Sequence, residues 1–239
     1  MKIDKLDDQF SWYLPYYSQF GQDKYLNEEV FRNKTNGVFV EIGAYDGIKL
    51  SNTYFFEKEM NWSGICVEPV PPLFSKAKEN RRCLCINKGI ADVAKTFKFL
   101  HVIGGDQYGI IEDGAYPKIK GREHTEMLSG LVEFHDPYHL NIIQKELVEL
   151  GGSKELLEVE CIPINELLQM LPTNKIDYLS IDTEGSEFRI LQTLDFSFYD
   201  IDVIGFEVLT PRKEIPTFME KNGYKLINNL GYDHIYKKV

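Results

Sequence analysis

Short apolar segments alternate with polar, helix-like segments along the chain. This alternation predicts an α/β fold in which helices cover a mainly parallel sheet. The predicted strands are nearly all apolar, as strands buried on both faces should be: Val38–Ile42, Gly64–Val67, Leu84–Asn87, Tyr178–Ile181 and Val203–Val208. The predicted helices are Ser51–Met60, Pro72–Asn80, Ile164–Leu171 and Glu187–Leu194.

Two regions depart from this alternation. At the C-terminus, two strand-type runs at 224–228 and 233–237 flank a short turn that contains Gly231, which predicts a hairpin. Between Phe97 and Val159 many glycines and prolines interrupt the pattern, and a connection this long is usually functional or carries elements of its own. We predict one helix in it, Asn141–Leu150, and treat 1–239 as a single domain with an insert at about 101–158.

The first 30 residues are predicted to form an arm or helix that packs on the core. Large aromatic side chains are used mainly for burial, and the segment is rich in them: Phe10, Trp12, Tyr13, Tyr16, Tyr17 and Phe20. A sugar-stacking wall or a contact between copies in a homo-oligomer are the alternatives. The polar pair Gln22 and Asp23 follows Gly21 and is a candidate for the cofactor or acceptor pocket.

Charge and cysteine usage exclude several classes of protein. The 239 residues include 27 Lys and Arg against 37 Asp and Glu, a formal net charge of −10, which argues against a surface for nucleic acid or an anionic membrane. No stretch approaches the roughly 18 apolar residues of a membrane helix, and we expect a cytoplasmic location. The four cysteines form no C-x-x-C pair, so neither a zinc site nor a redox motif is predicted. We interpret them as small buried hydrophobic residues: Cys66, Cys83, Cys85 and Cys161.

The most informative segment is the first strand with the turn that follows it. The strand carries Glu41 and opens into a turn with glycines four apart, Gly43 and Gly47, which allows a ligand to approach the backbone. The third glycine of the dinucleotide pattern G-x-G-x-x-G is missing, and Glu41 and Asp46 bring negative charge where phosphates would lie. S-adenosylmethionine, which carries a sulfonium and an ammonium and no phosphate, suits this turn better.

Two further carboxylates follow strands in the order that a nucleoside requires. Glu68 comes directly after the second strand, where it can accept hydrogen bonds from both ribose hydroxyls. Asp92 follows the third strand, where it can accept one from an adenine amino group. The acidic turn after the first strand, Glu68 and Asp92 together favour a cofactor site over solvated loop carboxylates.

The chain resembles a known family, the FkbM family of S-adenosylmethionine-dependent methyltransferases. The resemblance runs from about Ser18 to the C-terminus. Its most specific segment is the run D-x-E-G-x-E after the fourth strand. The segments that carry it are Ser18–Asp23 (SQFGQD), Phe39–Gly47 (FVEIGAYDG), Ser51–Thr53 (SNT), Val67–Pro69 (VEP) and Ile181–Glu187 (IDTEGSE).

The resemblance implies a Rossmann-like class I methyltransferase fold: a seven-stranded, mostly parallel sheet with an antiparallel last strand and helices on both faces. It also implies roles for individual residues. The methionine part of the cofactor would be held by Glu41, Gly43, Asp46 and Gly47, with Asn52 at the start of the next helix, Glu68 at the ribose and Asp92 at the adenine.

Candidates for chemistry lie at the ends of the fourth and fifth strands. Ligands of open α/β sheets bind beyond the carboxyl ends of the strands, so Asp182 should face the reactive methyl, with Glu207 as its neighbour and Glu184 close by. These carboxylates could bind the cofactor's ammonium, act as general base toward a hydroxyl, or hold a divalent cation such as Mg²⁺ through Asp182 and Glu207. Structural capping of the next helix is the alternative, above all for Glu187.

The insert could fold over the carboxyl edge of the sheet and supply a histidine. Of the candidates, His135 is chosen as a base because neighbouring carboxylates could orient it, although an exposed loop histidine is the commoner outcome. We expect an O-methyltransferase for a hydroxyl of a sugar, glycan or related small molecule, with the insert capping the acceptor. The alternatives are a non-catalytic cofactor-binding scaffold and, less favoured, an NAD(P)-dependent oxidoreductase.

Overall fold

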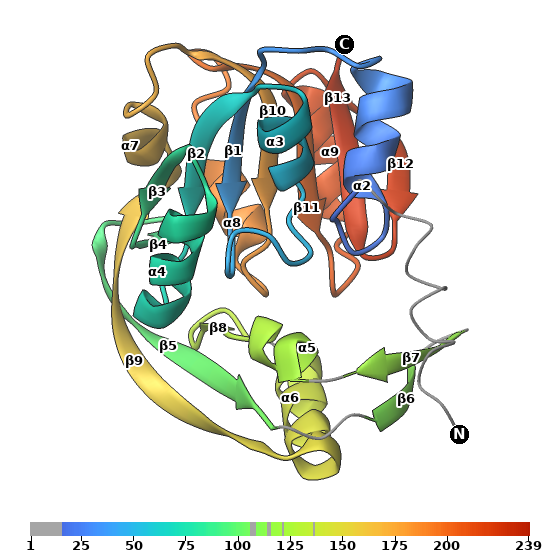
Figure 1. Cartoon of the computed structure of the whole chain (residues 1–239). Helices are drawn as coiled ribbons and strands as arrows, with labels where there is room; N and C mark the ends of the chain where they lie inside the picture. Colours follow the sequence, from blue (N-terminus) through green and yellow to red (C-terminus); the bar gives the residue numbers. More distant parts are fainter. Residues whose placement is uncertain (1–15, 106–108, 114–115, 121, 136) are drawn as a thin grey trace.

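A computed structural model of the chain describes residues 16–105, 109–113, 116–120, 122–135 and 137–239 (Figure 1). Its centre is a seven-stranded sheet. In spatial order the strands are β12 (Tyr224–Leu230), β13 (Asp233–Lys238), β11 (Asp200–Glu207), β10 (Lys175–Ile181), β1 (Val38–Ile42), β2 (Ser63–Val67) and β3 (Leu84–Ile86). The α/β class and all five predicted strands are confirmed, with ends that shift by up to three residues.

The order of the strands reverses at β1. From there the chain proceeds outward to β2 and β3 on one side and to β10 and β11 on the other, and all these neighbours pair in parallel. The predicted C-terminal hairpin is present, and its second strand, β13, inserts antiparallel beside β11. A crevice between β1 and β10, at the carboxyl ends of the strands, is where ligands bind in sheets of this topology.

The two faces of the sheet are covered by different helices because neighbouring side chains in a strand point to opposite faces. Val40 packs with α7 (Ile164–Leu168), α8 (Glu187–Thr193) and α9 (Glu214–Lys221). Phe39 packs with η3 (Leu26–Val30) and α3 (Tyr54–Glu59) on the other face, next to α2 (Gln22–Tyr25). Helix α4 (Pro71–Asn80) follows β2, and its Leu73 packs under the insert.

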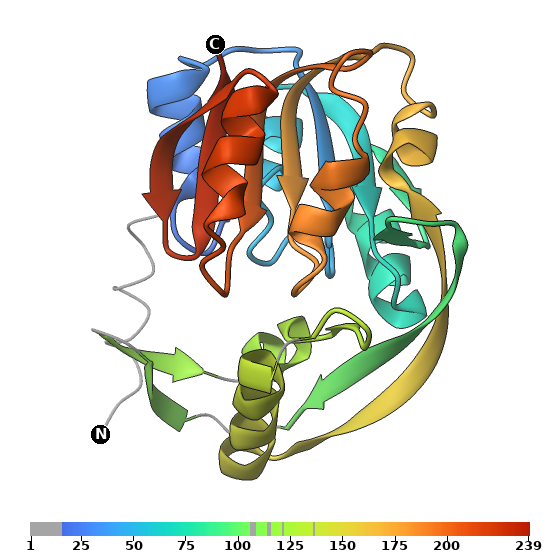
Figure 2. The same cartoon turned by 180° about the vertical axis from the view of Figure 1, so that it is seen from behind.

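The insert contains long strands that the sequence pattern did not predict. After β4 (Gly89–Ala91), strands β5 (Lys95–Gly104) and β9 (Gly152–Pro163) form an antiparallel ribbon that extends from the body past the carboxyl edge of the main sheet (Figure 2). The ribbon carries α5 (Arg122–Met127), β8 (Gly130–Leu131), α6 (Pro137–Leu150) and the hairpin of β6 (Gly109–Asp113) and β7 (Tyr116–Lys120). The predicted helix 141–150 is the C-terminal part of α6.

The described part of the N-terminal arm lies against the core. The ring of Tyr16 packs on Phe55 with 4.5 Å between centroids, and Tyr17 packs edge-on against Tyr54. Three more of the aromatic residues predicted for this arm, Phe10, Trp12 and Tyr13, lie outside the described residues. Among the helices described, none has the length and apolar character needed to cross a membrane.

Candidate active site

A cleft lies between the carboxyl ends of the main strands and the insert, with an empty volume of about 1480 Å³ that includes space open to solvent. Of the predicted site residues, six line it: Gly43, Asn52, Glu68, Asp182, Glu184 and Glu207. Five do not: Glu41, Asp46, Gly47, Asp92 and His135. The insert supplies much of the opposite wall, including Phe99, Glu126, Leu131 and Tyr138.

The turn after β1 brings backbone to the floor of the cleft. The amides of Gly43 and Ala44 both donate to the carbonyl of Val67, at 3.0 and 2.9 Å, which folds the turn across the end of β2. Gly43 has a φ of +89°, and a Cβ there would lie 1.8 Å from the carbonyl oxygen of Asp182. Only glycine allows this approach between the ends of β1 and β10.

Glu41 does not contact the cleft, which corrects its predicted role at the cofactor. It lies one residue before the end of β1, on the face that α3 covers. Its buried carboxylate accepts from the Arg81 guanidinium at 2.8 Å, the Ser51 hydroxyl at 2.8 Å and the Thr53 hydroxyl at 2.8 Å. The backbone amide of Asn52 also donates to it at 2.8 Å. These bonds fix segment 51–53, which is why α3 begins at Tyr54 and not at the predicted Ser51.

Asp46 and Gly47 also support the turn and do not line the cleft. The Asp46 carboxylate accepts from the amides of Ile48 and Lys49, at 3.0 and 2.8 Å. Gly47 has a φ of +86°, and a Cβ there would lie 3.0 Å from the Cα of Ala77 in α4. Both residues shape the turn, whereas direct contact with a ligand was predicted.

Asn52 does face the cleft, as predicted. Its side-chain amide donates to the hydroxyl of Ser180 at 3.1 Å. Its Oδ1 is buried and accepts no hydrogen bond from the described residues. A buried acceptor without a donor is costly unless a ligand or water satisfies it. A ligand that carries an N–H or O–H donor would therefore be stabilised here.

The carboxylate of Glu68 is held at the end of β2 by two backbone amides. Oε2 accepts from Tyr45 at 2.9 Å and Oε1 accepts from Val70 at 2.8 Å, so each oxygen keeps a second lone pair. Burial raises the pKa of Glu68 to about 8, against the opposing effect of these two amides. A second lone pair on each oxygen is what the predicted contact with two ribose hydroxyls would require.

Asp92 lies away from the cleft, so the structure does not bring it to the predicted adenine position. Strand β4 leaves the main sheet and pairs with β9, so Asp92 is carried toward α8. Its carboxylate lies 3.6 Å from the guanidinium of Arg189. The cleft in this region is lined instead by Lys88, Gly89 and Ile90.

Three carboxylates converge where β10 and β11 end. One oxygen from each of Asp182, Glu184 and Glu207 lies within 4.8 Å of the others. Burial first, and then the charge of the neighbouring carboxylates, raise all three pKa values well above the ordinary range. Oε2 of Glu207 is buried and accepts no hydrogen bond from the described residues. The three carboxylates therefore bind protons more readily than free carboxylates do, and a bound cation would oppose that effect.

Glu187 is separate from this cluster and has a structural role. Its Oε1 accepts from the amides of Thr183 and Gly185, at 2.8 and 3.0 Å, and from the Thr183 hydroxyl at 2.9 Å. These bonds fold the turn before α8 and hold Asp182 and Glu184 at their positions. Glu187 therefore has a structural role, as the alternative proposed, but it holds the turn before α8 and does not cap the helix itself.

The histidine that reaches the acidic cluster is His139 and not the predicted His135. His139 is buried in the first turn of α6, and its Nδ1 lies 3.3 Å from Oε2 of Glu184. Its Nε2 lies 3.0 Å from the carbonyl oxygen of Leu128 and must donate to it, which leaves Nδ1 as the ring atom that faces Glu184. His135 stacks on His139 with 4.6 Å between centroids. Asp136, the carboxylate that follows His135 in the sequence, lies outside the described residues.

Of the two N-terminal candidates, Gln22 lies at the cleft and Asp23 does not. Gln22 lines the cleft, and its side-chain amide donates to Asp233 at 2.5 Å. Asp23 is buried below it and accepts from the amides of Tyr17 and Ser18, which anchors the arm. Sequence reasoning missed Asp233, because the hairpin that brings it to Gln22 is 211 residues further along the chain.

A parallel α/β sheet with an antiparallel strand beside its last parallel strand, and an acidic cleft at its carboxyl edge, defines a Rossmann-like, class I methyltransferase. The sequence profile described as "Methyltransferase FkbM domain" matches residues 41–226. The chain therefore belongs to the FkbM methyltransferase family, and the resemblance found in its motifs is confirmed.

Other comparisons add less. Among curated proteins none matches the chain. Among solved structures, the chain is similar to precorrin-6y C5,15-methyltransferase from Geobacter metallireducens GS-15, with 11% identity, 86% of this chain and 82% of that chain covered, and a TM-score of 0.32. A similarity this distant carries no inference about the reaction.

Proposed function

We propose that this methyltransferase uses S-adenosylmethionine and transfers the methyl group to a hydroxyl of a sugar, glycan or related small molecule. The proposal rests on the residues that line one cleft. Glu68, a carboxylate placed for ribose hydroxyls, and the cluster of Asp182, Glu184 and Glu207 line the same space.

The donor set of the cleft fits this cofactor. Its acidic lining favours a cationic ligand. The side-chain oxygen Oδ1 of Asn52 accepts no hydrogen bond from the described residues and could accept one from an ammonium group. Glu68 would hold the ribose hydroxyls through its remaining lone pairs. The cofactor supplies an electrophilic methyl group on a positively charged sulfur. Asp182 at the end of β10 would face that positive charge.

The transfer requires a group that takes the proton of the acceptor hydroxyl. The methyl carbon loses its bond to sulfur, forms one to the hydroxyl oxygen, and the hydroxyl proton must leave as that bond forms. Glu184 lines the cleft, and the buried ring of His139 lies behind it with Nδ1 3.3 Å from Oε2. Glu184 in its ionised state would accept the proton, and the ring of His139 would hold its carboxylate in position.

A divalent cation is the alternative means of activating the hydroxyl. Carboxylate oxygens are the hard ligands that Mg²⁺ takes, and the three clustered oxygens lie within 4.8 Å of one another. We expect turnover to persist in a chelator such as EDTA, because Glu184 can accept the proton. Turnover that disappears in EDTA and returns with Mg²⁺ would move this role to the cation.

The acceptor would occupy the side of the cleft under the insert. Phe99 and Tyr138 from the insert and Tyr232 from the C-terminal hairpin give this side aromatic walls. Apolar walls with a few placed polar groups are typical of small-molecule sites. This lining, together with the need to deprotonate a weak acid, supports a hydroxyl of a sugar or related small molecule as the acceptor.

The test is calorimetric titration with S-adenosylmethionine and its demethylated product, with NAD as a negative control. We expect micromolar binding of the first two alone, a strong loss in Glu68→Ala, and no change in Asp92→Ala, because Asp92 lies outside the cleft. Turnover is then measured on monosaccharides and nucleotide sugars. Absence of binding would leave a non-catalytic scaffold, and binding of NAD alone would indicate an oxidoreductase.

A further inference from the structure

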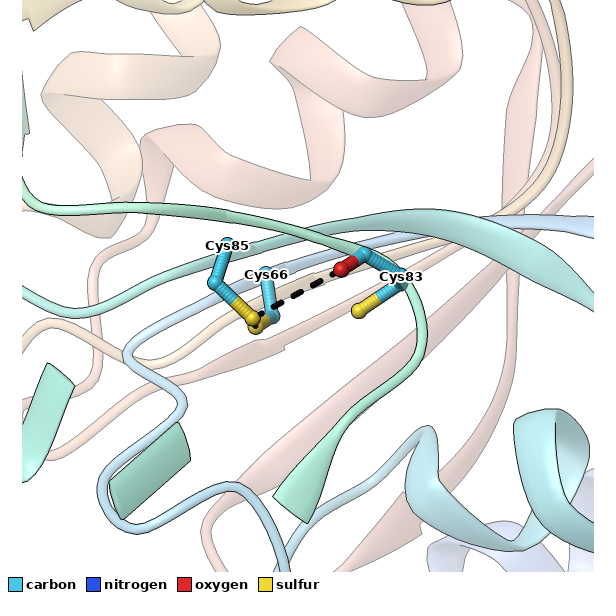
Figure 3. A group of neighbouring side chains, drawn as sticks. All are labelled: Cys66, Cys83 and Cys85. Atoms are coloured by element: carbon cyan, nitrogen blue, oxygen red, sulfur yellow. Dashed lines mark hydrogen bonds between the residues drawn. The ribbon is translucent and has the colours of Figure 1, made fainter. Parts of the chain in front are cut away.

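Three cysteine side chains meet at the edge of the main sheet, outside the lining of the cleft. The sulfur atoms of Cys66, Cys83 and Cys85 all lie within 4.8 Å of one another, and those of Cys66 and Cys85 are 3.2 Å apart (Figure 3). The sequence contains no C-x-x-C pair, and so the cluster was not predicted. It arises across two strands.

The geometry of the sheet explains why these sulfurs converge. Cys66 in β2 and Cys85 in β3 are direct partners in the parallel ladder. Cys83 precedes Cys85 by two residues, so its side chain leaves the chain on the same face. Cys83 therefore completes a triangle with the pair already formed between the strands.

The segment that carries Cys83 is held rigidly. The buried carboxylate of Glu57 in α3 accepts from the backbone amides of Arg82 and Cys83, at 2.7 and 2.6 Å. The same carboxylate pairs with the guanidinium of Arg81. A turn anchored by three donors presents its thiol in a defined position, which lowers the cost of binding a ligand there.

The cluster is closed on one side and accessible on the other. Cys66 is buried, whereas Cys83 and Cys85 are half-buried, which differs from the predicted full burial. Strand β3 is the last strand on its side of the sheet, so solvent reaches the cluster from the edge. An ion could enter there without opening the core.

We propose that Cys66, Cys83 and Cys85 form a three-thiolate site for one soft, thiophilic metal ion of the Cu(I) type. Thiolates select soft ions, in contrast to the carboxylate oxygens of the cleft. Three thiolates around one ion at bonds of about 2.3 Å have sulfurs about 4.0 Å apart in a plane. The observed separations, from 3.2 to at most 4.8 Å, bracket this value.

The number of ligands favours Cu(I) over zinc. Structural zinc sites almost always have four protein ligands, whereas the described residues offer three here. On binding, each coordinating thiol releases its proton to solvent and forms a bond to the metal, and no electrons are transferred because copper is supplied as Cu(I). A disulfide between Cys66 and Cys85 is the competing chemistry, and it would need an external oxidant.

The test is anaerobic titration of the fully reduced protein with Cu(I) against a chromogenic Cu(I) chelator. We expect wild type to retain one ion per chain and to show thiolate-to-copper absorption in the ultraviolet. Cys83→Ser and Cys85→Ser should each lose at least 100-fold in affinity. The matched control is Cys161→Ser, a cysteine of β9 outside the cluster, which should bind as wild type does.

Binding of S-adenosylmethionine, or the circular dichroism spectrum if that proposal fails, verifies that each variant is folded. No uptake by wild type would overturn the site, as would unchanged affinity in both cluster variants. Retention of Zn²⁺ and not Cu(I) would overturn the assignment to a soft monovalent ion. A loss of 2 Da on mild oxidation with no uptake of metal by the reduced protein would assign the cluster to disulfide chemistry.

Discussion

Replacement of Arg81 by Met should remove more stability than that of any surface arginine. The Arg81 side chain is 0% exposed and pairs with two carboxylates that are also buried, Glu41 at 4% and Glu57 at 3% exposure. It donates as well to the Gly47 carbonyl at 3.1 Å and the Thr53 hydroxyl at 2.8 Å. One side chain thus joins the turn after β1 to the beginning and the middle of α3.

The expected cost is about 3 to 5 kcal/mol of the free energy of unfolding, because removing one partner of a buried ion pair leaves the other charged without compensation. With a urea dependence of about 2 to 3 kcal/mol per molar for a chain of this size, the unfolding midpoint should fall by about 1 to 2 M.

The assay is urea unfolding at pH 7 followed by circular dichroism. Arg189→Met is the matched control, since Arg189 is 56% exposed and lies 3.6 Å from Asp92, and exposed pairs contribute about 0 to 1 kcal/mol. The reasoning would be refuted if Arg81→Met lowered the free energy of unfolding by less than about 1 kcal/mol, or by no more than the control does. Arg81 would then not be needed to hold the turn after β1 against α3.

Three further predictions concern the cleft. Ribose hydroxyls donate to the carboxylate form of Glu68, and burial raises the pKa of this group to about 8. Below pH 8, the affinity for S-adenosylmethionine measured by calorimetry should therefore increase as the pH increases, by up to about tenfold per pH unit. In Glu68→Gln the affinity should not depend on pH. Gly43→Ala should weaken this binding and cost more than about 1 to 2 kcal/mol in thermal unfolding, because φ is +89° and the new Cβ would lie 1.8 Å from the Asp182 carbonyl oxygen. His139→Gln should lower kcat at least about tenfold and shift its pH profile without changing cofactor affinity, whereas His135→Gln should leave that profile in place.

For each of these three predictions, one result would contradict the reasoning. Equal pH dependence in wild type and Glu68→Gln would place the titrating group elsewhere. Unchanged stability of Gly43→Ala would mean that the ends of β1 and β10 can separate without cost. An identical pH profile for the His139 variant would show that Glu184 takes up a proton without help from the histidine.

The sequence by itself determined the architecture of the body and the family. Runs of apolar residues mark strands buried on both faces, and this local signal placed all five predicted strands and the C-terminal hairpin. The motif segments identified the family, which the match over residues 41–226 confirms. The positions of Glu68, Asp182 and Glu207 followed as well, because a residue at the end of a parallel strand lies at the ligand-binding edge whatever its neighbours are.

Only the tertiary structure decided which partner each remaining side chain has. Glu41 was assigned to the cofactor because the sequence does not show that Arg81, 40 residues away, fills the space beside it. Asp92 was misplaced because β4 leaves the main sheet, and His139 was passed over because the direction of α6 depends on a long ribbon. The cysteine cluster depends on the register of β2 with β3. Periodicity reports whether a position is buried, whereas a carboxylate, imidazole or thiol acquires its chemistry from groups that packing brings to it.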